Sequence, residues 1–237
     1  MEKYLLMHFL GDTSSQPAGH FEEHIKPQVE AWRQEMEGRG LLIDGAALDS
    51  EFATTVRNRE PGAPVEDGPF AETEERLTGI DLIEARDLEE AVAAASAHPT
   101  LRAGAIEVRP LVPGMPTPAP AEPKPGKRRY VMLVCWDQTG DAEILAEDLD
   151  DENDPMADWI EETGDRRLYG WQLQPPSLAH TVREVDGSPV VIDGPFAETK
   201  EQIGGYDLLE CEDLDEAIGI ARAHGATILD LRPVSGD

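Results

Sequence analysis

The sequence contains the same domain twice, and this duplication constrains the fold more than any other feature. The motif Asp-Gly-Pro-Phe-Ala-Glu-Thr occurs at residues 67–73 and again at 193–199. Other segments agree at the same spacing: 4–6 with 130–132, 55–57 with 181–183, 79–82 with 205–208, and 87–91 with 213–217. Each copy is too long for a solenoid repeat, so the pattern indicates a tandem duplication of a whole domain.

A proline-rich segment separates the two copies. Between residues 112 and 127, proline recurs every two or three positions, which favours an extended, semi-rigid polyproline II spacer. We therefore predict a first domain at 1–111, a linker at 112–127 and a second domain at 128–237.

Apolar periodicity predicts the order of elements within each copy. In the first copy we expect a strand at 4–10, a helix at 21–37, strands at 41–43 and 53–58, a hairpin strand returning at 65–67, a strand at 80–85, a helix from 87 and a last strand at 105–108. Pro27 leaves two alternatives for the first helix. Either the helix kinks, or a new helix begins there with proline in its first turn.

This order predicts an α+β fold made of two ferredoxin-like domains, each with a hairpin inserted in its sheet. Helices would cover one face of each sheet and leave the other face open. Two such sheets packed face to face would close a barrel-like sandwich within one chain, which is an intramolecular pseudo-dimer.

Composition excludes several classes of function. The chain has 20 basic and 49 acidic residues, and its formal net charge is −29. So negative a field repels nucleic acids and anionic membranes, although it would suit docking onto a basic protein surface. No run approaches the ~20 apolar residues of a membrane span, and residues 4–9 indicate a strand and not a signal peptide. Cys135 and Cys211 are the only cysteines, so we expect no disulfide framework and a cytoplasmic location.

The motifs resemble those of the YCII-related family, in its branch named for Asp-Gly-Pro-Phe. The second copy also carries Leu-Gln-Pro-Pro at 173–176 and Lys-Glu-Gln-Ile-Gly-Gly-Tyr at 200–206, and both copies close on a similar segment, at 108–111 and 231–234. The resemblance covers nearly the whole chain, once per copy. It implies a dimeric α+β barrel fold and a family without a settled reaction, whose structural relatives include small cofactor-free oxygenases and muconolactone isomerases.

The resemblance also implies candidate partners and residues. Some family members are encoded near alternative sigma factors or fused to them, and others carry a histidine–aspartate pair proposed as an active site. Here His24 resembles that histidine and Asp49 resembles that aspartate. The first copy departs from the family pattern at Glu74, Thr78 and Ile80, and the second copy has no histidine in its first helix region. An activity that needs both features would survive in one copy or straddle the two.

Four residues are candidates for acid–base catalysis. His24 and Asp49 form one candidate pair, because an imidazole oriented by a carboxylate is a suitable general base. Asp67 and Asp193 begin the duplicated motif and allow two interpretations. They either shape a structural turn, or they point into the barrel as proton acceptors or ligand anchors.

Four further residues are candidates for ligand binding. His8 lies in the first strand, where it would line a pocket or pack in the core. Phe70 and Phe196 of the motif are either core residues or ligand contacts. Tyr206, the tyrosine of the family pattern, is assigned to ligand binding with them.

Two functions stay open at this point. One is a small cofactor-independent enzyme that applies acid–base chemistry to a small, partly apolar molecule. The alternative is a non-catalytic binding or regulatory module, such as a partner of a transcription or sigma factor, with ligand sequestration as a third hypothesis. The spacing of His20 and His24 is compatible with a metal, but no metalloprotease pattern accompanies it, so we predict neither a metal nor a cofactor. Further association into a homo-oligomer stays open.

Overall fold

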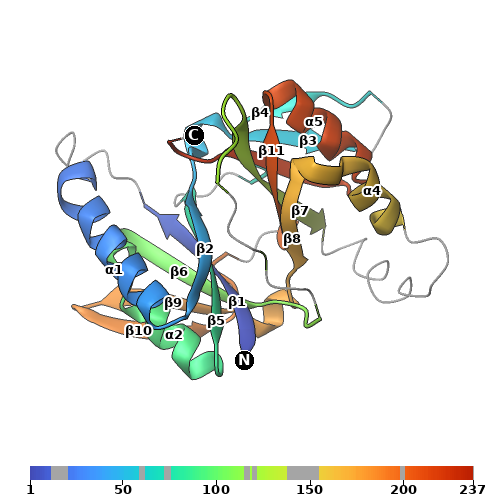
Figure 1. Ribbon diagram of the computed structural model, residues 1–237. Coiled ribbons are helices and arrows are strands. Elements are labelled where there is room, and N and C mark those ends of the chain that lie inside the picture. Colours follow the sequence, from blue (N-terminus) through green and yellow to red (C-terminus); the bar gives the residue numbers. More distant parts are fainter. Residues whose placement is uncertain are drawn as a thin grey trace. The chain divides into compact units, whose positions relative to one another are not determined.

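The computed structural model describes residues 1–11, 21–58, 62–71, 76–114, 118, 122–137, 155–197 and 201–236. The chain forms two compact units, and each unit takes segments from both sequence repeats (Figure 1). Unit 1 consists of Met1–Ala47, Thr73–Pro120 and Leu173–Ala197; unit 2 consists of Leu48–Glu72, Ala121–Gln172 and Glu198–Asp237. The sequence repeats and the compact units are therefore different divisions of the chain.

Unit 1 is built on a six-stranded sheet with the order β10-β9-β6-β1-β5-β2, and its strand pairs are antiparallel. The strands are β1 (Glu2–Leu10), β2 (Leu42–Ala47), β5 (Arg76–Ala85), β6 (Gly104–Pro110), β9 (His180–Val185) and β10 (Ser188–Asp193). The helices are α1 (Lys26–Gly38) and α2 (Leu88–Ser96), with a π-helical turn at Phe21–Ile25 and 3₁₀ turns at Pro99–Ala103 and Pro176–Leu178. The first-repeat elements of this sheet alternate as β-α-β-β-α-β, which is the ferredoxin-like order.

Unit 2 repeats this arrangement with the order β4-β3-β12-β7-β11-β8. Its strands are β3 (Thr54–Arg57), β4 (Val65–Asp67), β7 (Arg128–Asp137), β8 (Arg167–Gln172), β11 (Glu201–Cys211) and β12 (Ile228–Pro233). Its helices are α4 (Pro155–Thr163) and α5 (Leu214–Ala223), with 3₁₀ turns at Ser50–Phe52 and Gly164–Arg166. The predicted α+β class and the two ferredoxin-like domains are confirmed. Among the described residues, no helix is long and apolar enough to cross a membrane.

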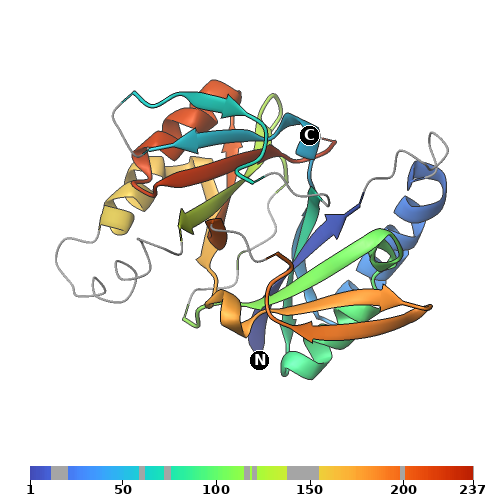
Figure 2. The same ribbon diagram turned by 180° about the vertical axis from the view of Figure 1, so that it is seen from behind.

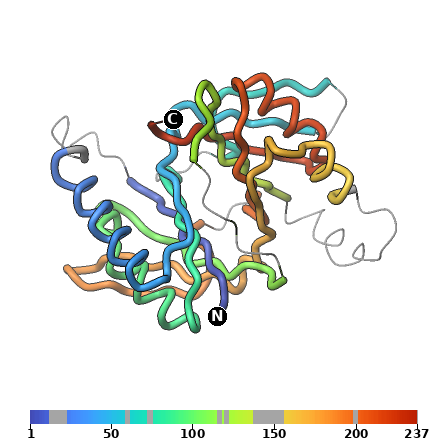
Figure 3. Tube along the Cα trace, viewed as in Figure 1, coloured from blue at the N-terminus to red at the C-terminus, as the bar shows by residue number. Residues whose placement is uncertain are grey.

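The hairpins are exchanged between the repeats, which the sequence analysis did not predict. The first-repeat hairpin β3–β4 pairs with β12 of the second repeat, and the second-repeat hairpin β9–β10 pairs with β6 of the first. Figure 2 shows β9 and β10 in orange beside the green β6, and the tube in Figure 3 follows the same path. The last strands of the two repeats are alike in sequence. The sequence pattern therefore predicts that each hairpin forms, but not which last strand it pairs with.

Local sequence explains where the helices begin. An α-helix begins at Lys26 with Pro27 in its first turn, after the π-helical turn, which decides between the two alternatives for this proline. Asp87 caps α2 by accepting a hydrogen bond from the Glu90 amide at 2.9 Å, and Asp213 caps α5 in the same way. These caps satisfy amides that have no partner within the helix.

The helices cover one face of each sheet with a compact apolar layer. In unit 1, Trp32 and Met36 of α1 and the alanines of α2 pack on the sheet residues Tyr4, Leu6, Ile83, Ala85, Ile106, Val108 and Val182. In unit 2, Trp159 and the α5 residues Ala217, Ile220 and Ala221 pack on the equivalent strands. Each exchanged hairpin contributes one fully buried valine to these layers, Val182 in unit 1 and Val56 in unit 2. Each core is therefore completed by a residue of the exchanged hairpin.

Candidate functional site

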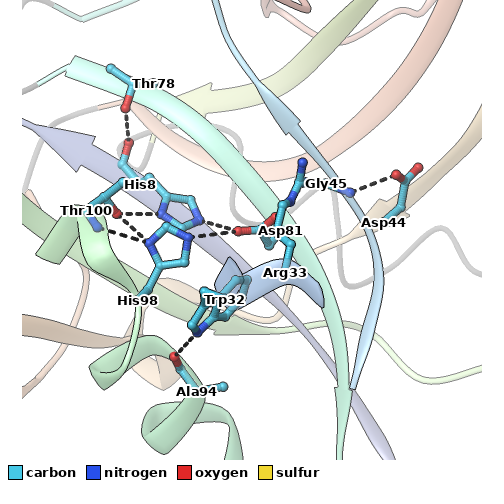
Figure 4. A network of polar contacts seen from close by, with 10 residues as sticks. All are labelled: His8, Trp32, Arg33, Asp44, Gly45, Thr78, Asp81, Ala94, His98 and Thr100. Carbon is cyan, nitrogen blue, oxygen red and sulfur yellow. Dashed lines mark hydrogen bonds and ion pairs between the residues drawn. The ribbon is translucent and has the colours of Figure 1, made fainter. Parts of the chain in front are cut away.

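A cluster of polar side chains interrupts the apolar layer of unit 1. Alternate residues of a strand share one face, so His8 lies on the helix-covered face of β1 and Asp81 on that of β5. His98 follows α2 and precedes the 3₁₀ turn that contains Thr100. The register of the sheet and the short connection after α2 thus bring these side chains together (Figure 4).

The two imidazoles face the same carboxylate oxygen and the same hydroxyl. Nε2 of His8 lies 2.9 Å from Oδ2 of Asp81, and Nε2 of His98 lies 3.6 Å from the same oxygen. Oγ1 of Thr100 lies 3.0 Å from Nδ1 of His8 and 2.7 Å from Nδ1 of His98. The ring centroids are 4.3 Å apart, and the side chains of His8, Asp81 and His98 are at most 5% exposed.

Arg33 of α1 completes the cluster from the side nearer to solvent. Its Nη2 and Nε donate to Oδ1 of Asp81 at 2.8 and 3.2 Å, and its side chain is 30% exposed. Gly45 of β2 pairs with Asp81 across the sheet. A Cβ at this position would overlap both Nη2 of Arg33 and Oδ1 of Asp81. The glycine therefore makes room for the ion pair.

Burial and charge set the protonation of the cluster. Burial alone would raise the pKa of Asp81, but the hydrogen bond and charge of His8, together with Arg33 and His98, outweigh it and hold that pKa below its ordinary value. Burial, with repulsion from His8, lowers the pKa of His98 to about 2. Asp81 is thus ionised and His98 neutral at pH 7. The Thr100 amide donates to Nδ1 of His98 at 3.3 Å, which places the proton of that ring on Nε2.

Unit 2 contains a counterpart of this cluster without the second imidazole. Asp207 and His224 occupy the matching places, with Nε2 of His224 4.0 Å from Oδ2 of Asp207. Arg167 of β8 supplies the guanidinium, at 2.6 Å from Oδ1 of Asp207. Val134 pairs with Gly205 as His8 pairs with Gly79, so valine stands where unit 1 has His8. Burial raises the pKa of Asp207 to about 6 despite Arg167, and burial lowers the pKa of His224 to about 4.

Of the residues predicted from the sequence, His8 lies in this cluster and His24 and Asp49 lie elsewhere. His24 is exposed on the π-helical turn of unit 1. Asp49 is exposed at the start of a 3₁₀ turn in unit 2, where it accepts a hydrogen bond from the Ser235 hydroxyl at 2.7 Å. The two belong to different units, so their pairing stays a prediction.

The aspartates of the duplicated motif end the exchanged hairpins with exposed side chains. Asp67 is exposed, and Asp193 is 97% exposed, with its Oδ1 3.5 Å from Nε2 of His180. The glycines that follow, Gly68 and Gly194, have φ of 109° and 111°, a region that favours glycine. The motif therefore turns the chain sharply at the end of each hairpin.

The remainder of the motif fastens each hairpin to the strand that accepts it. The Phe70 amide donates to Oδ2 of Asp230 in β12 at 2.9 Å, and the Phe196 amide donates to Oε2 of Glu107 in β6 at 2.8 Å. Asp230 is in turn paired with Arg232, and Glu107 with Arg109; all four side chains are buried. These contacts favour the structural interpretation of the motif.

The predicted aromatic residues differ in their surroundings. Phe70 and Phe196 are half-buried, and Phe196 stacks on Phe9 with ring centroids 4.0 Å apart. Tyr206 is buried in unit 2 with Trp171 and Tyr169 at 6.2 and 6.4 Å. It neighbours Asp207 in β11, so it lies on the opposite face of the sheet from the counterpart cluster.

Sequence reasoning missed four members of the unit 1 cluster, namely Arg33, Asp81, His98 and Thr100. A signal for two of them is present, because Asp81 and His98 recur in the second repeat as Asp207 and His224 at the spacing of the duplicated motif. A histidine and an aspartate retained at matched positions of both repeats were the available indication.

Comparisons with known proteins agree with the duplication. A model of the YCII-related domain matches residues 12–114 and 131–231. An uncharacterized protein from Rhizobium meliloti (strain 1021) is 51% identical over 51 residues, which is 22% of this chain and 41% of that protein's length. A crystal structure described as a putative chlorite dismutase aligns with 99% of this chain and 96% of its own, at 11% identity and a TM-score of 0.46. A likeness of that size carries no argument about function.

Proposed function

Because this chain belongs to the YCII-related family and contains the family's domain twice, we propose that one of its two copies is catalytic. In this proposal unit 1 transfers a proton to or from a small, partly apolar molecule at the cluster of His8, Asp81, His98 and Thr100. Unit 2 keeps the same frame, but it has Val134 in place of His8 and does not carry out the reaction.

The observation that supports this proposal is the position of the His8 imidazole between Asp81 and Thr100. A carboxylate that holds one ring nitrogen and a hydroxyl that holds the other fix the orientation of the ring. A histidine oriented by a carboxylate at one ring nitrogen is the usual general acid or base of enzymes near neutral pH. In this proposal the substrate displaces the Thr100 hydroxyl and exchanges its proton with Nδ1 of His8. The corresponding valine in unit 2 has no group that can exchange a proton.

The residues around the cluster indicate the class of substrate. Arg33 is the member that reaches solvent, and its guanidinium would bind a carbonyl or carboxylate oxygen of the substrate. Trp32 lies edge-on to His98 at 4.4 Å and adds an apolar surface. Since His8, Asp81 and His98 are at most 5% exposed, the substrate would reach them by displacing the Arg33 side chain from Asp81.

A ligand screen with matched variants tests the proposal. Small carbonyl and carboxylate metabolites are screened for a thermal shift with wild type, His8→Val, His24→Ala and Asp193→Ala. We expect a ligand whose shift is lost in His8→Val and kept in the other two variants. A ligand whose shift survives in His8→Val would contradict the proposal, and loss in His24→Ala and Asp193→Ala instead would favour the residues predicted from the sequence.

The other roles assigned from the sequence are the alternative to this proposal. They are catalysis by His24, Asp49, Asp67 and Asp193, and ligand binding by Phe70, Phe196 and Tyr206. A cytoplasmic location is likewise a proposal, supported by the two buried free thiols of Cys135 and Cys211.

A second candidate function is a binding module that docks on a basic protein surface, such as that of a transcription or sigma factor. Two observations favour it: the net charge of −29 and an apolar edge strand, β10, in which Val190, Val191 and Ile192 are 40–49% exposed. An exposed apolar edge strand is a common site of association. Recovery of a basic partner by wild type, but not by Val191→Lys, would support this function; equal recovery would contradict it.

A further inference from the structure

We infer that His8, Asp81 and His98 form a binding site for one divalent transition-metal ion of the Zn²⁺ or Co²⁺ type. Two imidazoles and one carboxylate are a donor set that suits these ions. The inference does not rest on the proposed function, because metal binding is measured without any substrate. An ion bound to Nε2 of His8 would keep the proton of that ring on Nδ1 and prevent the imidazole from accepting another, so an occupied site would be an inactive state of the proposed enzyme.

The distances between the donor atoms are close to those around a bound ion. Zn²⁺ binds imidazole nitrogen and carboxylate oxygen at about 2.0–2.2 Å, so neighbouring ligand atoms of a tetrahedral site lie about 3.3–3.6 Å apart. Oδ2 of Asp81 lies 2.9 Å from Nε2 of His8 and 3.6 Å from Nε2 of His98. All three donor atoms lie within 4.8 Å of one another. Small side-chain adjustments would therefore admit an ion between them.

The groups behind the donors hold them in the orientation that a metal requires. Both Nδ1 atoms face Oγ1 of Thr100, whose two lone pairs can accept from both rings when the Nε2 atoms bind the ion. Arg33 binds Oδ1 of Asp81 and leaves Oδ2 for the metal. Binding has one cost, since Nδ1 of His98 would no longer accept the 3.3 Å hydrogen bond from the Thr100 amide.

The rest of the described chain makes the site specific. Within the described ranges, no other group of three or more histidine, cysteine, aspartate or glutamate side chains brings its donor atoms this close. The counterpart in unit 2 offers only Asp207 and His224, because Val134 replaces the third donor. We therefore expect one ion per chain, in spite of the duplication.

Metal retention by matched variants tests the inference. Chelator-treated protein is loaded with Co²⁺ or Zn²⁺, passed through a desalting column and analysed for bound metal. Wild type is expected to retain one ion per chain and, with Co²⁺, to show the visible absorption of a low-symmetry site. His8→Val is expected to lose both signals. Valine already occupies the equivalent place in unit 2, so this variant is compatible with folding, and a thermal melt verifies it.

His24→Ala controls for weak binding by exposed side chains on this acidic protein, and it is expected to retain the ion. His98→Gln provides a second test of the site if His8→Val fails to fold, and it is expected to lower retention at least tenfold. Failure of wild type to retain either ion would overturn the inference. Equal retention by wild type and the folded His8→Val or His98→Gln protein would also overturn it, because the metal would then be bound elsewhere.

Discussion

At the scale of single residues, one side chain distinguishes two otherwise matched clusters. Asp81 and Asp207 occupy equivalent strand positions, and each is paired with an arginine. Burial pushes both pKa values upward, but only Asp81 has His8 beside it. The pKa of Asp81 therefore lies below its ordinary value, whereas that of Asp207 rises to about 6. The carboxyl group is thus the stronger acid in unit 1.

This contrast predicts the effect of Asp207→Asn on stability at different pH values. The pKa of Asp207 is raised in the folded protein, from 3.8 to about 6, so the stability that this carboxyl contributes is complete below pH 3.8 and is lost as the pH rises through 6. Asparagine does not titrate. The free energy of unfolding of Asp207→Asn relative to wild type should therefore rise between pH 4 and pH 7, by about 2–3 kcal/mol.

Chemical denaturation of both proteins across this pH range gives the difference directly. At any one pH, the difference in unfolding free energy also includes the effect of removing the charged partner of Arg167. The change of this difference with pH is therefore the informative quantity. A difference that is constant, or that falls as the pH rises, would show that Asp207 does not have a raised pKa.

The glycine opposite the cluster gives a prediction about packing. A methyl group at Gly45 would overlap the Arg33–Asp81 pair, so Gly45→Ala should destabilise the protein by about 1–3 kcal/mol. Gly38→Ala is the matched control, because nothing lies within 4 Å of the added methyl group and the position is helical. We expect it to be neutral or slightly stabilising. Equal unfolding free energies for the two variants, measured in urea, would rule out the close packing at Gly45.

The sequence predicted part of this cluster. Strand alternation pointed to His8, because alternate residues of the first strand face the sheet interior. Asp81 and His98 were passed over, because their proximity to His8 depends on the register of β1 with β5 and on the path of the chain after α2. Neither is determined by local periodicity.

At the scale of elements, the duplicated motif attaches each exchanged hairpin to the strand that accepts it. The amides of Phe70 and Phe196 bind buried carboxylates of the accepting strands. Each carboxylate also pairs with an arginine two residues along its strand. Both hairpins therefore dock in the same way, through the main chain of the same motif.

The contact between the Phe70 amide and Asp230 predicts that Asp230→Asn lowers the free energy of unfolding strongly. The variant would weaken the bond to the Phe70 amide and remove the charge that Asp230 presents to the buried guanidinium of Arg232, which costs about 3–5 kcal/mol. Glu66→Gln is the control on the same hairpin, where the pair with Arg57 is half-exposed and is worth at most about 1 kcal/mol. A similar loss of unfolding free energy for the two variants in chemical denaturation would contradict a buried, stabilising contact at Asp230.

The positions of the helices and strands were more predictable from the sequence than the pairing of the strands. Periodicity located the strands and the helix that begins near Asp87. The accepting strand of each hairpin was not predictable, because Val108–Leu111 and Leu231–Val234 present similar edges. The choice between them depends on which apolar layer Val56 and Val182 pack into, and this depends on tertiary packing and not on the local sequence.

At the scale of the whole molecule, the reciprocal exchange of hairpins links the two repeats. Arg183 of β9 pairs with Ala105 of β6, whereas the equivalent residue of the first repeat, Arg57, pairs with Ile228 of β12. An exchange of this kind makes each core depend on both halves of the sequence. Separate expression of one repeat would therefore leave a core incomplete.

Engineered disulfides test the exchange. Ala105→Cys with Arg183→Cys should cross-link within one chain under mild oxidation, because paired strand positions fulfil the distance requirement of a disulfide. Ala105→Cys with Arg57→Cys would cross-link only if each hairpin stayed in its own repeat. Mass spectrometry of peptides from the monomer band identifies the bond, and the opposite pattern would refute the exchange.

Both proposals depend on a cluster in which His8 and His98 share Asp81 and Thr100. Imidazole ¹⁵N NMR of metal-free wild type and His8→Val measures this most directly, with His224 of unit 2 as the internal reference. Loss of His8 should move the ring ¹⁵N resonances of His98 and leave those of His224 unchanged. Unaltered His98 resonances in the folded variant would mean that the two rings do not share these partners.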